Sequence, residues 1–153
     1  MSLLKKVRAG QKVMSAVFAW NFDDTMVGTD GVTYSLGTDT AFDIIAAAKT
    51  FDVIGLPLNS IVVGGAVVVS TAFDTAGYDI IVGDSSVANR YLASTDVKAP
   101  GITALVPTGF VNTGSLPIRI SLQSDDVCTT GVAYLRVDYI IRDRADEVSA
   151  SAD

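Results

Sequence analysis

The clearest pattern in the sequence is an alternation of apolar and polar residues with a period of two, which is typical of half-buried β-strands. Residues 118–123 read IRISLQ and place three apolar side chains on one face: Ile118, Ile120 and Leu122. Residues 132–141 alternate in the same way, and we expect one set of side chains to face the core: Ala133, Leu135, Val137 and Tyr139. Both segments are therefore predicted to be strands with one buried face.

Further segments have the β-branched and apolar content of strands, and turn residues bound each of them. They are residues 13–22, 41–56, 61–73, 78–82, 88–93, 102–106 and 110–111. Segment 41–56 is ambiguous, and two strands or one bent strand are favoured over a turn of helix. Residues 23–39 are rich in Gly and Asp, which favours a long loop at an end of the domain or at a contact.

Segment 61–73 is the most apolar run of the chain, and its continuity predicts a strand that is buried on both faces. The pair Gly64-Gly65 interrupts it. A glycine inside a strand marks a β-bulge or a close approach of another backbone segment. A dinucleotide-binding loop is not indicated, because the spacing of three glycines and the following helix are missing.

These eight or nine short strands predict an all-β protein, an antiparallel β-sandwich with jelly-roll or related Greek-key connections and extended N- and C-terminal arms. We expect a basic N-terminal arm over residues 1–12, a sandwich domain over 13–147 and a tail over 148–153.

The composition agrees with this fold class. Nearly a third of the 153 residues are Val, Ile or Thr, which favour strands. Sixteen of the seventeen acidic residues are Asp, which is common in turns, and Glu147 is the single Glu. An apolar fraction of 49% provides enough material for one core.

The chain contains no histidine, which argues against most catalytic constellations. Gly83-Asp84-Ser85 resembles the nucleophile block of GDS-type esterases, but no helix is expected after it and no histidine can assist it, so a turn is favoured. Cys128, the single cysteine, has no activating base and is expected to be buried or inert. We therefore expect no enzyme, no catalytic residue and no cofactor.

Two groups of residues raise binding functions that we consider less favoured. The pairs Asp23-Asp24 and Asp125-Asp126 offer oxygen ligands for Ca²⁺, but neither has the spacing of a calcium loop, so no metal site is predicted. Phe18, Trp20 and Phe22 share one face of a strand. They could form a carbohydrate platform, although core packing is the favoured interpretation.

Charge divides the chain unevenly. Residues 1–22 contain four basic residues and no acidic one, namely Lys5, Lys6, Arg8 and Lys12, whereas the remainder is strongly acidic. These four are the candidate partner-binding residues, because a basic arm can bind an acidic neighbour or another copy of the chain. A soluble tail is the simpler alternative. We expect no nucleic-acid partner, because the acidic body would repel phosphate.

No membrane partner is expected either, since the longest apolar run, residues 61–69, is far shorter than a spanning helix of roughly 20 residues. The first residues, MSLLKKVRAGQKV, lack the features of a signal peptide. The chain is therefore expected to be made and used in the cytoplasm.

Several motifs between residues 61 and 142 resemble small virion proteins of tailed bacteriophages, of the head decoration or cement type. The motifs are STAFD, IIVGDSS, NRYL, TALVPTG and YLRVDY, which begin at Ser70, Ile80, Asn89, Thr103 and Tyr134. The resemblance covers a little over half of the chain and includes no catalytic signature.

This resemblance implies a non-enzymatic structural protein on the exterior of the capsid. Such a protein would bind across the boundaries between major capsid subunits, and its partners would be the major capsid protein and copies of itself, as a dimer or trimer. Another virion component, such as a head fibre base or a tail-tube or tail-tip β-domain, is the main alternative. A carbohydrate-binding sandwich is the second.

Overall fold

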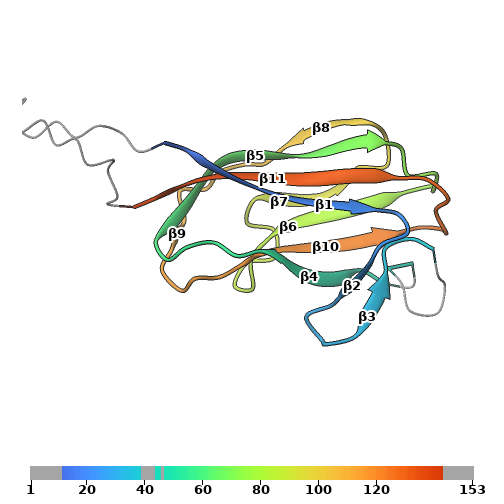
Figure 1. Ribbon diagram of the computed structural model, residues 1–153, viewed down its shortest axis with the longest axis horizontal. Helices are drawn as coiled ribbons and strands as arrows, with labels where there is room; N and C mark the ends of the chain where they lie inside the picture. Colours follow the sequence, from blue (N-terminus) through green and yellow to red (C-terminus); the bar gives the residue numbers. More distant parts are fainter. Residues whose placement is uncertain (1–11, 39–43, 46, 143–153) are drawn as a thin grey trace, which may run out of the picture.

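The structure is a computed structural model that describes residues 12–38, 44–45 and 47–142. The described residues form eleven β-strands, of which nine lie in two packed layers and two form a small hairpin beside them (Figure 1). No helix in this part of the chain could cross a membrane. The sequence-based prediction of an all-β antiparallel sandwich is confirmed.

The first layer is a sheet in the order β1-β11-β5-β8, and the second is a sheet in the order β4-β10-β6-β7. The first contains β1 (Met14–Asn21), β11 (Val132–Ile141), β5 (Ser60–Thr71), β8 (Gly101–Ala104) and β9 (Val111–Asn112), which pairs with the start of β5. The second contains β4 (Lys49–Ile54), β10 (Ile118–Ser124), β6 (Tyr78–Gly83) and β7 (Leu92–Asp96). The hairpin consists of β2 (Thr25–Val27) and β3 (Thr33–Ser35).

The connections repeatedly carry the chain from one layer to the other. From β1 the chain passes to β4 in the second sheet, returns to β5, and then enters the second sheet again at β6. The last two long strands, β10 and β11, also belong to different sheets. Non-adjacent strands therefore become neighbours, which is the jelly-roll or related Greek-key class of connection that the sequence predicted.

The core lies between the two sheets and comes from the alternating strands that the sequence identified. Ile118, Ile120 and Leu122 of β10 are at most 1% exposed. On β11 the expected inward residues are also buried: Ala133, Leu135 and Val137 fully, and Tyr139 in part. Both predicted faces are therefore confirmed.

A polar contact between aromatic side chains joins the two sheets inside this core. Trp20 of β1 donates a hydrogen bond from Nε1 to the hydroxyl of Tyr78 on β6, at 3.2 Å. The Tyr78 hydroxyl donates in turn to the Leu36 carbonyl, at 3.1 Å, and its ring stacks on Phe73 with centroids 3.9 Å apart. Burial raises the pKa of Tyr78 far above its ordinary value, so this hydroxyl keeps its proton.

The glycine pair of β5 serves both purposes that the sequence suggested. The pairing with β11 shifts register beside Gly64, where Val63 is left out of the ladder, so a bulge is present. Gly65 has φ +133°, and a Cβ there would lie 2.2 Å from the Arg136 carbonyl oxygen. A side chain is thus excluded at Gly65 by both backbone conformation and space.

Several strand predictions need correction. The expected loop 23–39 contains the hairpin β2–β3, because the Asp30 carboxylate accepts a hydrogen bond from Val32 N and the turn from Gly28 to Gly31 brings two short strands together. The strand expected at 88–93 begins at Leu92. Within 41–56 the described strand is β4, and residues 39–43 and 46 lie outside the described residues.

Segment 61–73 was expected to be buried on both faces, and this is wrong for its outer face. Val63 is 39% exposed, whereas Val62 and Val67 face the core at 2% or less. The outer face of β5 thus carries valines although the described residues leave Val63 exposed there. An apolar run is consequently a poor guide to two-sided burial here.

Candidate functional site

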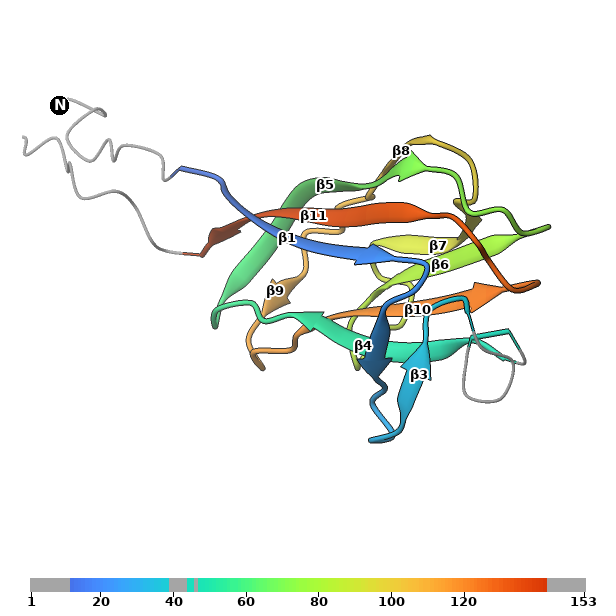
Figure 2. The same ribbon diagram turned by 45° about the vertical axis from the view of Figure 1, so that its right-hand side comes forward.

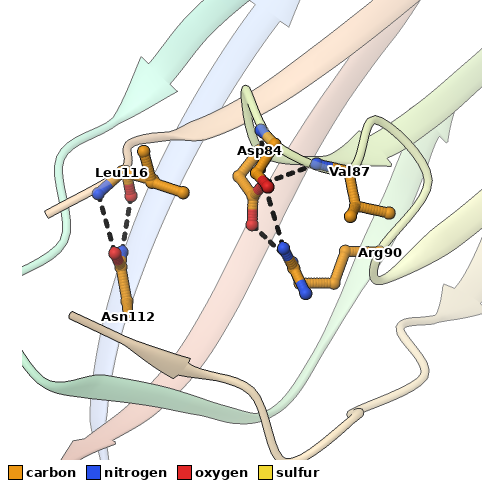
Figure 3. A network of polar contacts seen from close by, with 6 residues as sticks. Asp84, Val87, Arg90, Asn112 and Leu116 are labelled. Carbon is orange, nitrogen blue, oxygen red and sulfur yellow. Dashed lines mark hydrogen bonds and ion pairs between the residues drawn. The ribbon is translucent and has the colours of Figure 1, made fainter. Parts of the chain in front are cut away.

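The motif Gly83-Asp84-Ser85 forms a closed turn after β6. Asp84 is 2% exposed, and its carboxylate accepts hydrogen bonds from the backbone N–H groups of Ser86 and Val87, both at 2.8 Å (Figure 3). The Arg90 guanidinium donates to the same carboxylate at 2.5 Å. The prediction that this motif is a turn is confirmed. The hydrogen bonds of the Asp84 side chain stabilise this turn.

The electrostatics of Asp84 fit this structural role. Burial raises the pKa of Asp84, but the hydrogen bond from Arg90 and those from the amides of Val87 and Ser86 outweigh it, so the pKa lies below its ordinary value. Arg90 also lies over the ring of Phe110, 3.5 Å from its centroid. The carboxylate therefore stays ionised and holds Arg90, whose contact with Phe110 ties the loop after β6 to the loop after β8.

A second polar contact fixes the long loop between β8 and β10. The Asn112 side chain donates to the Leu116 carbonyl at 2.6 Å and accepts from the Leu116 N–H at 2.7 Å (Figure 3). The Asn112 carbonyl accepts a hydrogen bond from Asn59 N. This end of the sandwich is thus made of loops that their own side chains hold in place.

At the opposite end of the sandwich the Asp74 carboxylate performs a similar function. It accepts hydrogen bonds from Thr129 N at 2.6 Å, from the Thr129 hydroxyl and from Thr130 N at 3.0 Å. These hydrogen bonds lower the pKa of Asp74 from 3.8 to about 2. The β5–β6 loop is thereby joined to the β10–β11 loop.

The other residues singled out for chemistry have structural surroundings. Trp20 is 1% exposed and stacks on Phe18, and Phe18 and Phe22 pack against the core. The carbohydrate-platform alternative is therefore wrong, because the rings face inward. Cys128 is buried, as expected, and burial raises the pKa of its thiol.

No group of three or more metal-ligating side chains occurs among the described residues. Asp24 accepts a hydrogen bond from Asn21 N at the end of β1, and Asp125 lies beside Gly77. The two acidic pairs lie in turns at the same end of the sandwich.

Lys12, the one described member of the predicted basic group, is exposed and lies two residues before β1. Lys5, Lys6 and Arg8 lie outside the described residues. The start of β1 and the end of β11 lie side by side, since Met14 pairs with Tyr139, and both views place them at one end of the sandwich (Figure 2).

The outer face of the first sheet carries exposed apolar side chains beside charged ones, since Arg136 of β11 lies opposite Val17 and forms an ion pair with Asp138. One row of cross-strand neighbours runs Ala19, Tyr134, Val68 and Ile102 from β1 to β8. Ile102 is 76% exposed and Val17, in the next row, is 60% exposed. We call this surface the outer face. The exposed apolar row makes this face a candidate interaction site.

The edge of β1 is also open. The hydrogen bond from Phe22 N to Gly131 O extends the β1–β11 ladder, so the even-numbered residues of β1 bond to β11. The N–H and C=O groups of Ser15, Val17 and Ala19 therefore point away from the sheet. Among the described residues no strand pairs with this side of β1. Sequence reasoning missed this site, because it could not give the order of strands in the sheet.

The same fold occurs in two phage capsids. A chain of the cyanophage Pam1 capsid asymmetric unit is similar to this chain, with 18% sequence identity and a TM-score of 0.57 over 86% of both chains. A chain of the acidic stable capsid of Helicobacter pylori bacteriophage KHP30 has 15% identity and a TM-score of 0.53, over 88% of this chain and 90% of that one. The chain shares its fold with phage capsid chains.

This likeness confirms the resemblance to phage virion proteins at the level of the fold. No protein-family model matches the chain, and no curated protein sequence matches it. The comparison therefore gives the architecture over nearly the whole sandwich, and the role of the protein has to be argued from its surfaces.

Proposed function

We propose that the protein is a structural, non-enzymatic component of a tailed-phage virion. In this proposal it decorates the exterior of the capsid and stabilises it by binding across the boundaries between major capsid subunits. The observation that carries the proposal is the fold, which two phage capsid chains share over 86% and 88% of this chain. The protein would be assembled into the virion in the host cytoplasm.

The interior of the domain supports a structural role. The carboxylates of Asp84 and Asp74 are saturated with hydrogen bonds that close loops. The thiol of Cys128 is buried, and its raised pKa disfavours the thiolate that a nucleophile requires. These side chains stabilise the fold and are poorly placed to attack a substrate.

The exterior offers two features that a capsid-binding protein needs. The outer face provides exposed apolar area, including Ile102 and Val17. Residues 1–12, which precede β1 in the sequence, provide the basic side chains Lys5, Lys6, Arg8 and Lys12. We propose that these basic residues bind an acidic region of a neighbouring subunit, so part of the binding energy is electrostatic.

Purified capsids lacking the protein provide the test. The full chain should bind to them, and a variant with Lys5, Lys6, Arg8 and Lys12 changed to Gln should show roughly tenfold weaker binding, because it loses four favourable charges. A control variant with Lys49→Gln and Lys98→Gln changes two charges outside the arm and should bind like the wild type. Occupancy is measured by cryo-electron microscopy or by co-sedimentation.

Salt gives an independent measurement. Raising the ionic strength should weaken binding of the wild type more than binding of the four-Gln variant, since exposed charges are screened over about 8–10 Å. Equal occupancy of both variants at low salt would contradict the role of the arm. Imaging that locates the protein on the tail instead of the head would contradict capsid decoration and favour the alternative of a tail component.

A further inference from the structure

Strand β1 differs from the other edge strands of the sandwich. Its eight residues, MSAVFAWN, contain no charge and no proline. The other edges are shorter or charged: β4 carries Lys49 and Asp52, β7 has five residues and ends in Asp96, and β8 has four residues. Folded proteins normally protect a long edge with charges, prolines or bulges, because an open edge pairs with another strand.

We propose that this edge is a contact between two copies of the chain, in which β1 pairs antiparallel with β1 of a second copy about a two-fold axis at Val17. The proposal goes beyond capsid binding, since it concerns copies of this chain and names the surface that joins them. The two first sheets would become one continuous sheet across the dimer.

The backbone of β1 is suited to this pairing. The groups that point away from β11 belong to Ser15, Val17 and Ala19, which are spaced symmetrically about Val17. In the antiparallel pair Val17 meets Val17 of the second copy, and Ser15 meets Ala19. Each of these pairs can exchange two hydrogen bonds. The edge ends at Asn21, whose N–H is already bonded to the Asp24 carboxylate at 2.7 Å.

The side chains of β1 are complementary in the same register. Ala16 of one copy meets Phe18 of the other, so a small and a large side chain that both face the core lie opposite each other. On the outer face Ser15 meets Ala19, and two Val17 side chains, each 60% exposed in one copy, cover each other. The pairing keeps inward residues beside inward residues, as a sheet requires.

Charge complementarity favours a second copy as the occupant. Lys12 precedes β1, and Asp23 and Asp24 follow it. In the antiparallel pair Lys12 lies opposite Phe22 of the second copy, one position from Asp23. The basic start of each strand therefore meets the acidic turn at the end of the other, at both ends of the contact, while the strand between them is uncharged.

Sedimentation equilibrium of the full chain with the Val17→Lys variant tests the proposal. The wild type should be dimeric, and the variant should have the mass of one chain, because two lysines would meet on the axis. Val17 is exposed in a single copy, so the circular dichroism spectrum of the variant should match that of the wild type and show that the variant is folded. Ile102→Lys, at an exposed position on the opposite edge strand, is the matched control and should remain dimeric.

A cross-linking experiment tests the position of the axis. In a hydrogen-bonded antiparallel pair the Cα atoms lie about 5.5 Å apart, within the range of a disulfide. Val17→Cys should form a covalent dimer under mild oxidation, whereas Ile102→Cys should not. Cys128 is present in both variants and is buried, so it serves as an internal control.

Four outcomes would overturn the proposal: a wild type that is monomeric at all concentrations, a closed trimer, a Val17→Lys variant that remains dimeric, or an Ile102→Lys variant that dissociates. A monomeric wild type whose binding to capsids is lost on Val17→Lys substitution would assign Val17 to the contact with the capsid and not to a contact between copies. Failure of capsid binding by a wild-type dimer would instead contradict the proposed function and leave the contact between copies intact.

Discussion

Gly65 of β5 lies opposite Val137 of β11, in close contact with the backbone of that strand. Its φ of +133° and the 2.2 Å that a Cβ would leave to the Arg136 carbonyl oxygen both exclude a side chain. The neighbouring Gly64 is different, because a Cβ there would have its nearest contact at 3.6 Å, with the Asp138 carboxylate. The two glycines look equivalent in the sequence and have unequal roles in the fold.

This difference predicts the effect of adding one methyl group at each position. Gly65→Ala should lower the free energy of unfolding by about 2–4 kcal/mol, since the methyl group clashes with backbone that cannot move away. Gly64→Ala is the matched control and should change it by no more than about 0.5 kcal/mol. Urea denaturation of both variants measures the difference. Equal effects would contradict the strain assigned to Gly65.

Asp74 is the residue for which the structure predicts a pH dependence of stability. Its pKa is lowered from 3.8 to about 2 by hydrogen bonds from Thr129 and Thr130. A carboxyl whose pKa is lower in the folded state stabilises the fold above its unfolded pKa. This contribution is lost as the pH falls from about 4 through 2.

The Asp74→Asn variant should therefore be less stable than the wild type at pH 6, and the difference should shrink as the pH approaches 2. Asp126→Asn is a suitable control, because the Asp126 carboxylate is exposed and accepts no hydrogen bond from the described residues. Thermal melts at a series of pH values measure the effect. A difference that stays constant down to pH 2 would contradict the assignment.

Among the strands, β1 and β6 illustrate how the two sheets are held in register. Hydrogen bonds from Trp20 to Tyr78 and from Tyr78 to the Leu36 carbonyl cross the core at a single hydroxyl group. Hydrophobic burial alone does not fix how two sheets are placed, whereas a buried hydrogen-bonded group does so, because leaving its partners unpaired is costly.

Removing that hydroxyl should therefore destabilise the protein. Tyr78→Phe keeps the ring that stacks on Phe73 but leaves the Trp20 N–H and the Leu36 carbonyl without their partner, at a cost of about 1–3 kcal/mol. Tyr139→Phe, on a partly buried ring of β11, should cost less. Chemical denaturation followed by Trp20 fluorescence measures both. A loss that is equal in the two variants would contradict the role assigned to the Tyr78 hydroxyl.

The strands also indicate which elements the sequence could predict. The alternation of apolar and polar residues was enough to predict β10 and β11, because each strand has one face in the core. It failed for the hairpin β2–β3, where three-residue strands are too short to show a period and the turn around Asp30 decides the pairing. The strand predicted to begin at residue 88 begins at Leu92 in the structure. The preceding residues have a strand-like composition, but the contact between Asp84 and Arg90 holds them in a loop.

On the scale of the whole molecule, the fold class followed from composition and turn residues, whereas the candidate site did not. A strand is an edge or a central strand according to which distant segments pair with it, and β11 lies beside β1 although more than a hundred residues separate them. The open edge at Val17 therefore has no local signal. The basic residues before β1 were visible from charge alone, and the partner that they bind remains a prediction.

The adjacent positions of the start of β1 and the end of β11 make the molecule suited to engineering as a carrier. Guest peptides joined directly before β1 or directly after β11 would be attached at one side of the sandwich, next to each other. The same geometry suits circular permutation, in which the present termini are linked and new ones are opened in the β2–β3 turn. There Gly31 has no neighbouring atom within 4 Å of the position of an added Cβ.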